Sequence, residues 1–257
     1  MHHLEWLDNA ATRRRAASAL KWSIGLTAAL YLIPYGAILA YPLLLLSTLF
    51  HELGHGVVAM LTGGSFESLA IYADGSGVAS HRSSGGDLVH ALTAAGGLIG
   101  PAVVAGIAFA AGRSKSGARG FLVVVGVAVG IAVALVVRNG FGVFFSGTFV
   151  LVVLALGLRG SAAAAQLGTV FLATQLALSV FSRADYLFTD VAVTGGGTMP
   201  SDTSVMASAL GGTYWIWGLA CGGFSLAVLA AGVMWFLRAL RRPELGLAGA
   251  SARRGAE

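Results

Sequence analysis

Two histidines and a glutamate lie within an otherwise apolar stretch of this sequence. The stretch STLFHELGHGVVAMLTGG contains His51, Glu52 and His55 in the order HELGH. Residues four positions apart on a helix differ by about 40° in direction and about 6 Å in rise, so both imidazoles can reach one metal ion. Zinc in such a site lowers the pKa of a bound water to about 7, and Glu52 is close enough to take the proton.

The surroundings of HELGH decide between a metal site and two simpler interpretations. An HExxH pattern in a soluble helix is usually a solvated face, and a cluster of polar side chains between helices needs no metal. Inside an apolar segment each unpaired polar group is costly, which argues against the solvated face. A zinc ion and a wet cavity would satisfy all three groups, so a metal site is favoured over a metal-free cluster.

A catalytic zinc ion needs a third protein ligand and an open position. Asp185, in SVFSRADYLFTD, closes a later apolar segment and is the predicted ligand. If the intervening segments all cross the membrane, the HELGH helix and this later helix run parallel and end on the same side. Asp190 and Asp202, on the following loop, are the alternative ligands, and a helix-end carboxylate paired with Arg183 is the non-functional interpretation.

The composition identifies an integral membrane protein. Of 257 residues, 56% are hydrophobic and only 11% are charged, against about 25% in soluble domains. A membrane helix needs about 20 apolar residues. Seven segments approach that length: Leu20–Leu39, Pro42–Leu61, Leu88–Ala111, Phe121–Val137, Phe141–Leu158, Ala162–Phe181 and Tyr214–Leu240.

Two polar segments interrupt these spans. The Asp74-Gly75 turn between short alternating runs predicts a β-hairpin directly after the HELGH helix. A Gly-rich loop follows Asp185 and includes a short helix after Ser201. The predicted fold is therefore an all-α polytopic membrane protein with six or seven transmembrane helices and one short hairpin. Residues 1–19 form a basic tail, 20–242 one membrane-embedded domain and 243–257 a second tail.

The number of spans depends on whether the segment Leu20–Leu39 crosses. If it does, basic residues are divided almost evenly between the two sides of the membrane. If it does not, nearly all of them lie on one side, as the positive-inside rule prefers. The length and apolarity of the segment favour crossing, so both versions stay open. The basic residues serve orientation at the lipid surface, and no pattern typical of nucleic-acid binding is present.

Together these features resemble the site-2 protease family of intramembrane zinc metallopeptidases, and in particular its peptidase M50B-like branch. The resemblance extends from about Leu20 to Arg242 and rests on three stretches. They are YPLLLLSTLFHELGHGVVAMLTGGSFESLAIYADGSGVAS, TAAGGLIGPAVVAG and SRADYLF.

The resemblance implies that His51, His55 and Asp185 are the zinc ligands and that Glu52 is the catalytic base. Better-known members carry this aspartate in an Asp-Gly motif, whereas Tyr186 follows Asp185 here. The family cleaves peptide bonds of membrane-spanning substrates within the lipid bilayer. A bacterial inner membrane is the expected location. The competing interpretation is a proteolytically inactive metal-binding or transport protein that keeps the same site.

Overall fold

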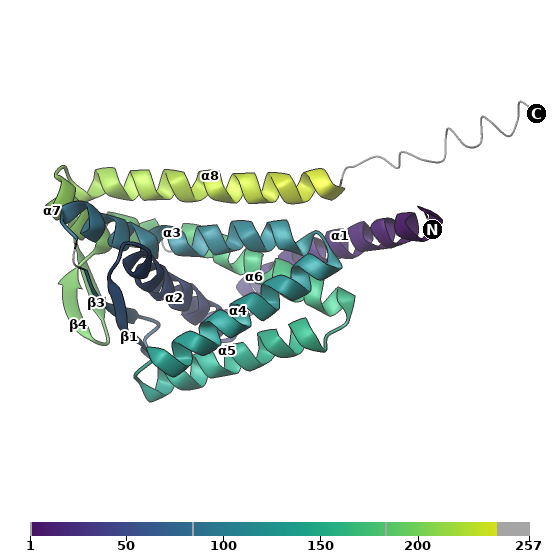
Figure 1. Ribbon diagram of the computed structural model, residues 1–257, viewed down its shortest axis with the longest axis horizontal. Helices are drawn as coiled ribbons and strands as arrows, with labels where there is room; N and C mark the ends of the chain where they lie inside the picture. The colour runs from purple at the N-terminus through teal and green to yellow at the C-terminus, as the bar shows by residue number, and fades with distance from the viewer. Residues whose placement is uncertain (1, 84, 183, 241–257) are drawn as a thin grey trace, which may run out of the picture.

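The protein is a bundle of long helices with two small β-hairpins at one end (Figure 1). The computed structural model describes residues 2–83, 85–182 and 184–240. Its α-helices are α1 (His2–Leu32), α2 (Gly36–Leu61), α3 (Asp87–Gly112), α4 (Lys115–Leu135), α5 (Gly140–Leu158), α6 (Ala162–Ser182), α7 (Asp202–Leu210) and α8 (Tyr214–Leu240). A 3-10 turn, η1 (Ala184–Phe188), follows α6.

Six of the described helices are long and apolar enough to cross a membrane: α2, α3, α4, α5, α6 and α8. This confirms the predicted all-α polytopic fold. Helix α1 is not among the six, because polar residues interrupt its apolar half. Lys21 and Ser23 lie in this half, and Thr27 accepts a hydrogen bond of 2.6 Å from Gln175 of α6. Helix α1 therefore packs on the bundle through polar as well as apolar contacts.

The predicted boundaries of the first two segments were wrong. Helix α1 stops at Leu32, within the expected segment Leu20–Leu39, and α2 starts at Gly36. Pro34 lies in the turn between them, and Tyr35 adopts a left-handed conformation with φ 64°. A Cβ atom at Gly36 would lie 1.7 Å from a carbonyl oxygen of α1, so the turn requires glycine. Pro42, expected in the first turn, lies inside α2 instead.

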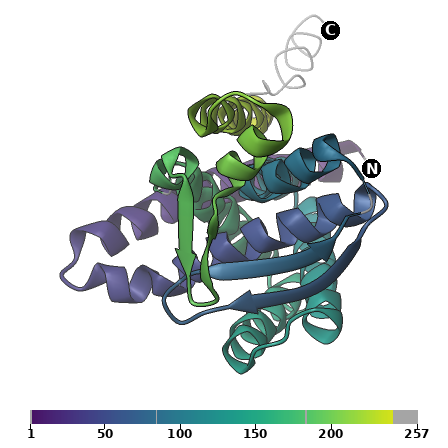
Figure 2. The same ribbon diagram turned by 90° about the vertical axis from the view of Figure 1, so that its left-hand side faces the viewer.

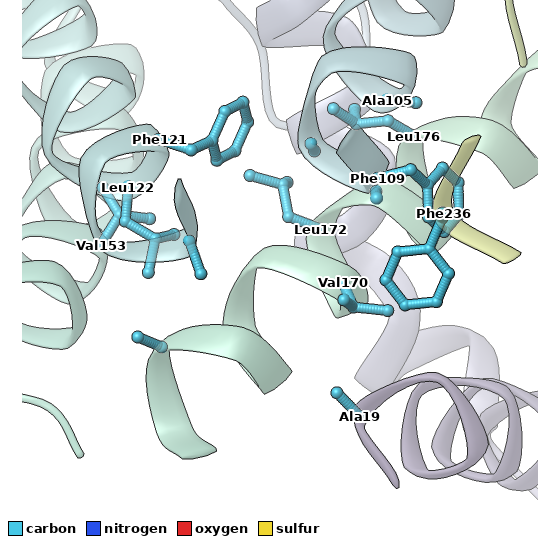
Figure 3. Packing of buried hydrophobic residues seen from close by; sticks show 14 of the residues in the cluster. Ala19, Ala105, Phe109, Phe121, Leu122, Val153, Val170, Leu172, Leu176 and Phe236 are labelled. Atoms are coloured by element: carbon cyan, nitrogen blue, oxygen red, sulfur yellow. The ribbon is translucent and has the colours of Figure 1, made fainter. Parts of the chain in front are cut away.

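The largest apolar core lies between α3, α4, α6 and α8, with a contribution from α1 (Figure 3). Phe109 of α3 and Phe236 of α8 meet edge to face with ring centroids 5.9 Å apart. Leu172 and Leu176 of α6 extend the same cluster towards Phe121 of α4. Helices α3 and α6 are the most buried of the six spans. They form the fixed centre of the bundle.

Small residues bring α2 and α3 into backbone contact. A Cβ at Gly54 would lie 2.2 Å from the carbonyl oxygen of Gly96, and one at Gly96 would lie 2.7 Å from that of Gly54. Gly100, four residues further along α3, approaches α2 in the same way. The spacing of Gly96 and Gly100 is typical of close packing between membrane helices, and the structure confirms that role. Helix α3 is thereby held against the HELGH turn.

The two hairpins lie beside each other at one end of the bundle (Figure 2). The first pairs β1 (Ser65–Ile71) with β2 (Gly77–Arg82), as predicted after the HELGH helix. Its turn is fixed by Asp74, whose side chain accepts hydrogen bonds from the backbone N–H and the hydroxyl of Ser76. The second hairpin, β3 (Val191–Thr194) with β4 (Gly197–Pro200), was not predicted. The helix expected after Ser201 is α7.

The tight turn between α4 and α5 fills the outer edge of β1. Leu69 donates a backbone hydrogen bond of 2.8 Å to Val136, and Arg138 donates one of 3.0 Å back to Leu69. The side-chain amide of Asn139 then bonds both the N–H and the C=O of Ile71, at 3.1 and 2.6 Å. The turn thus pairs with β1 as a short strand would and fixes the first hairpin to the bundle.

The start of α1 and the end of α8 lie at the same end of the bundle, opposite the hairpins (Figure 1). The basic cluster Arg13–Arg15 of α1 is therefore at the same end as Arg238, in the last turn of α8. This arrangement agrees with the six-span version of the charge distribution. The division into residues 1–19, 20–242 and 243–257 stays a prediction, and residues 241–257 lie outside the described part of the chain.

Candidate metal centre

Helix α2 presents the two histidines of HELGH on one face. The Nε2 atoms of His51 and His55 lie 3.1 Å apart, and the rings meet edge to face with centroids 4.8 Å apart. On its other side His55 places Nδ1 2.8 Å from the carbonyl oxygen of Thr93 in α3. A carbonyl only accepts hydrogen bonds, so Nδ1 carries the proton. The lone pair of Nε2 is then free to bind a metal.

Asp202 completes the group from the first turn of α7. Its Oδ2 lies 3.1 Å from Nε2 of His51, and its Oδ1 lies 3.4 Å from Nε2 of His55. All three potential ligand atoms lie within 4.8 Å of one another. Oδ2 is buried and makes no hydrogen bond within the described structure. Two imidazole nitrogens and a carboxylate facing one point are a typical zinc donor set, so these residues could hold a metal ion.

The electrostatics of the centre keep Asp202 ionised. Burial by itself raises the pKa of this carboxyl group, but the adjacent His55 and His51, in their protonated forms, lower the pKa further than burial raises it. The result lies below the ordinary value for aspartate. An ionised carboxylate is the form that binds a cation.

A network of hydroxyl groups holds Asp202 in place. Ser201 caps α7 by accepting a hydrogen bond of 3.2 Å from the N–H of Ser204, and its hydroxyl donates to the carbonyl oxygen of Thr189 at 2.6 Å. Ser204 also donates its hydroxyl to Asp190. Asp190, one of the alternative ligands, is thus committed to the base of the second hairpin and does not join the two histidines.

The three candidate carboxylates differ in their position relative to the two histidines. Asp202 is next to the histidines and Asp190 is not. Asp185 belongs to η1, but its side chain lies outside the described part of the structure, so its role stays a prediction. Sequence reasoning ranked Asp202 only as an alternative. The local pattern, Ser201 followed by Asp202, marks a helix N-terminus but does not indicate that this turn lies next to the two histidines.

Glu52 lies beside the metal group but faces β2. Its side chain is 6% exposed. It is hydrogen-bonded to the backbone of Ala79. A Cβ at Gly77 would lie 2.8 Å from Oε1 of Glu52, so only a residue without a side chain leaves room for the carboxylate. Strand β2 thus positions the carboxylate from one side, while α2 positions it from the other.

A cavity of about 320 Å³ adjoins His51 and Glu52. Its other walls are the turn of the first hairpin, strand β3, α3, the end of α6, η1 and one residue of α8, Ser225. Gly195, at the tip of the second hairpin, donates a backbone hydrogen bond of 2.9 Å to the hydroxyl of Ser76 in the first. The two hairpin tips therefore meet beside the cavity. A peptide segment that entered this space would pass next to the Glu52 carboxylate.

Helix α3 restricts the position of His55. A Cβ at Gly97 would lie 2.2 Å from Nε2 of His55, which is closer than any real contact. Thr93, one turn earlier on α3, accepts the hydrogen bond from the same ring. The close packing of α2 on α3 thus serves the geometry of the metal group.

Four further polar residues differ in their relation to the metal group. His81 stacks on His55 with centroids 6.4 Å apart, and burial followed by the adjacent His55 lowers the pKa of His81. His90 is exposed at the start of α3. Tyr186, which follows Asp185, places its ring edge to face with His51 and lines the cavity. Asn139 pairs with β1.

Comparisons with known proteins identify the family. The family model described as Peptidase M50B-like matches residues 22–232, which include α2 to α7, the last turns of α1 and most of α8. Neither the curated proteins nor the solved structures gave a match. The six apolar helices and the family together indicate a multi-pass integral membrane protein. Because this match covers most of the sequence, the chain belongs to the Peptidase M50B-like family.

Proposed function

We propose that this protein is a zinc-dependent intramembrane endopeptidase that hydrolyses peptide bonds of membrane-spanning proteins. The observation that carries the proposal is the meeting of His51, His55 and Asp202 next to Glu52 and a cavity. Membership of a peptidase family supports the reaction class. The bacterial inner membrane is the proposed location, on the strength of the resemblance to bacterial site-2 proteases.

His51, His55 and Asp202 are the proposed metal ligands. The fixed Nδ1 proton of His55 and the ionised Asp202 provide the protonation states that binding requires. Nitrogen and carboxylate ligands in this number suit zinc and leave one position open. When bound, zinc supplies Lewis-acid activation of water and of the scissile carbonyl group.

Glu52 is the proposed general base. Its carboxylate takes a proton from the attacking water as the new C–O bond forms, and it then delivers that proton to the leaving nitrogen as the C–N bond breaks. No proton is lost or gained overall, since water adds across the peptide bond. The burial of Glu52 beneath Gly77 and Ala79 keeps bulk water away from this transfer.

The cavity sets the requirement for the substrate. Helices, η1 and both hairpins enclose it around Glu52, and we infer that the scissile segment enters in an unwound form. A membrane helix has its backbone groups bonded internally and exposes no peptide bond for attack. We therefore expect cleavage near the end of a substrate helix, where unwinding costs least.

The test compares wild-type protein with the variant Glu52→Gln. Glutamine has nearly the same shape, so the variant is expected to bind zinc as wild type does and to lose cleavage by more than about 100-fold, the usual size of a general-base contribution. Zinc is measured by elemental analysis of purified protein. Cleavage is measured as new protein N-termini in membranes of cells that express each form.

Each outcome decides one part of the proposal. N-termini that appear with wild type and not with Glu52→Gln support the peptidase. Zinc in both forms with no difference in N-termini favours the inactive metal-binding protein instead. If Glu52→Gln cleaves as well as wild type, the assigned base is wrong.

A further inference from the structure

A second cavity lies at the end of the bundle opposite the metal centre. It has a volume of about 400 Å³ and lies between the end of α3 and the last three turns of α8. Arg113 and Arg238 line it, together with Trp235 and three small or flexible apolar side chains, Ala231, Met234 and Ala239. Helix α8 extends for about 40 Å from Tyr214 to Leu240 at 1.5 Å per residue, so this cavity is separated from the metal centre by most of a bilayer.

The arginine side chains supply the charge of this cavity. Arg113 follows α3 directly, where its Nε donates to the carbonyl oxygen of Ala110 at 2.7 Å. Its guanidinium lies over the ring of Trp235, 4.7 Å from the centroid. These contacts use one of its five N–H donors and fix its plane. Arg238, three residues after Trp235, lines the same cavity. None of the lining residues in the described part of the chain is acidic, so no described carboxylate lies between the two cations.

The remaining walls are suited to a lipid. Met234 is 48% exposed and Trp235 is 57% exposed on the outward face of a span. An exposed apolar surface on a membrane helix contacts acyl chains, and tryptophan prefers the level of the headgroups. The charged and apolar walls thus adjoin at the depth where the phosphate and the first carbons of a phospholipid lie. A free phosphate ion would use the arginines but not the apolar wall.

We propose that Arg113, Arg238 and Trp235 form a binding site for an anionic phospholipid. The guanidinium groups of Arg113 and Arg238 hold the headgroup phosphate. Planar guanidinium suits phosphate because it donates two parallel hydrogen bonds. The ring of Trp235 orients the Arg113 guanidinium that lies over it. The exposed face of α8 contacts an acyl chain of the same lipid. The site joins α3 to α8 and is independent of the proposed peptidase activity.

The experiment uses the full-length protein purified in a neutral detergent. Dioleoyl phosphatidylglycerol and dioleoyl phosphatidylcholine are titrated separately, and bound lipids are counted by native mass spectrometry. Wild type is expected to bind the anionic lipid at least about tenfold more tightly than the zwitterionic one, given two guanidinium contacts. The double variant Arg113→Gln/Arg238→Gln is expected to bind both lipids equally, within about twofold.

The matched control is Lys115→Gln/Arg159→Gln. It removes the same charge from exposed residues at the same end of the bundle, at the start of α4 and after α5. It should keep the wild-type preference. Equal losses in both double variants would show that net charge alone attracts the lipid and would overturn the site. A wild type without preference would also overturn it.

Two further measurements test whether a loss of lipid binding comes from misfolding and whether the site binds free phosphate instead of a lipid. Arg238→Gln alone changes an exposed side chain at a helix end, so it should fold and lose about threefold of the preference, half of the effect on a logarithmic scale. Arg238→Gln with the full wild-type preference would count against the assignment. Inorganic phosphate in excess should not displace the lipid, because it lacks the apolar contact. Complete displacement would identify a phosphate site in place of a lipid site.

Discussion

The two parts of the candidate metal centre hold their side chains by different means. Helix α2 fixes His51 and His55 through its own geometry and through the backbone of α3, with the carbonyl of Thr93 and the close approach of Gly97. Helix α7 fixes Asp202 through side-chain hydroxyls on a loop, chiefly Ser201. The first support is rigid and lies within the bundle. The second depends on a few hydrogen bonds at the end of a hairpin.

This difference means that the centre should fail in different ways when each part is disturbed. Steric changes at the α2–α3 contact should displace a ligand within an intact fold. Changes in the loop should weaken the third ligand while leaving the two histidines paired. The three substitutions below test that distinction, beginning with the ligand itself.

The largest effect is expected for Asp202→Asn. Asparagine keeps the size but removes the negative charge, so zinc affinity should fall by more than about 100-fold, beyond the range seen for residues that merely support ligands. Affinity is measured by competition with a chromophoric chelator. Asp185→Asn is the decisive comparison, since Asp185 was the predicted ligand. Loss of zinc from Asp185→Asn and its retention by Asp202→Asn would reverse our assignment of the third ligand.

Gly97→Ala is expected to have an intermediate effect. Its new Cβ would lie 2.2 Å from Nε2 of His55, so the ring or α3 must move, and zinc affinity should fall about 10- to 100-fold. The control is Gly147→Ala in α5, where a Cβ would meet no atom within 4 Å. That change should leave zinc affinity unaltered and stability equal or higher by up to about 1 kcal/mol. Equal zinc affinity in both alanine variants would mean that α3 does not restrict His55.

Ser201→Ala is expected to have the smallest effect. Loss of the cap and of the bond to Thr189 costs about 1 kcal/mol, which corresponds to about a fivefold loss of zinc affinity. Ser114→Ala is matched to it, because Ser114 caps α4 in the same way with a 3.0 Å bond from Gly117. Ser114→Ala should lower thermal stability without changing zinc affinity. If it lowers both as Ser201→Ala does, the hydroxyl network has no particular role in placing Asp202.

The two histidines could be predicted from the sequence because local helix geometry alone determines their arrangement. The HELGH spacing places two histidines on one face in any helix, whatever surrounds it. The same holds for the Asp74-Gly75 turn and for α8, whose predicted bounds match the structure. The identity of the third ligand depends on how the chain returns after α6. The five-residue 3-10 turn η1 and the second hairpin carry the chain from α6 to Asp202, and no local pattern in the sequence indicates where that path ends.

The errors in the fold have similar causes. The break between α1 and α2 requires a left-handed conformation at Tyr35 and a residue without a side chain at Gly36. A hydropathy pattern predicts neither of these features. Pro42 was expected at a helix start because its missing N–H is harmless there, but packing keeps α2 continuous through it. Strands β3 and β4 are only four residues each and are joined by Gly195 and Gly196, so their pattern was too short to distinguish from a loop.

The turn between α4 and α5 also affects whether folded molecules associate with one another. A two-stranded sheet exposes backbone groups on both outer sides, and such an edge can recruit a strand from another molecule. Here Val136, Arg138 and the amide of Asn139 occupy the outer side of β1. At Leu69 and Ile71, self-association through that edge is therefore prevented by the hydrogen bonds that the chain's own turn makes to the strand.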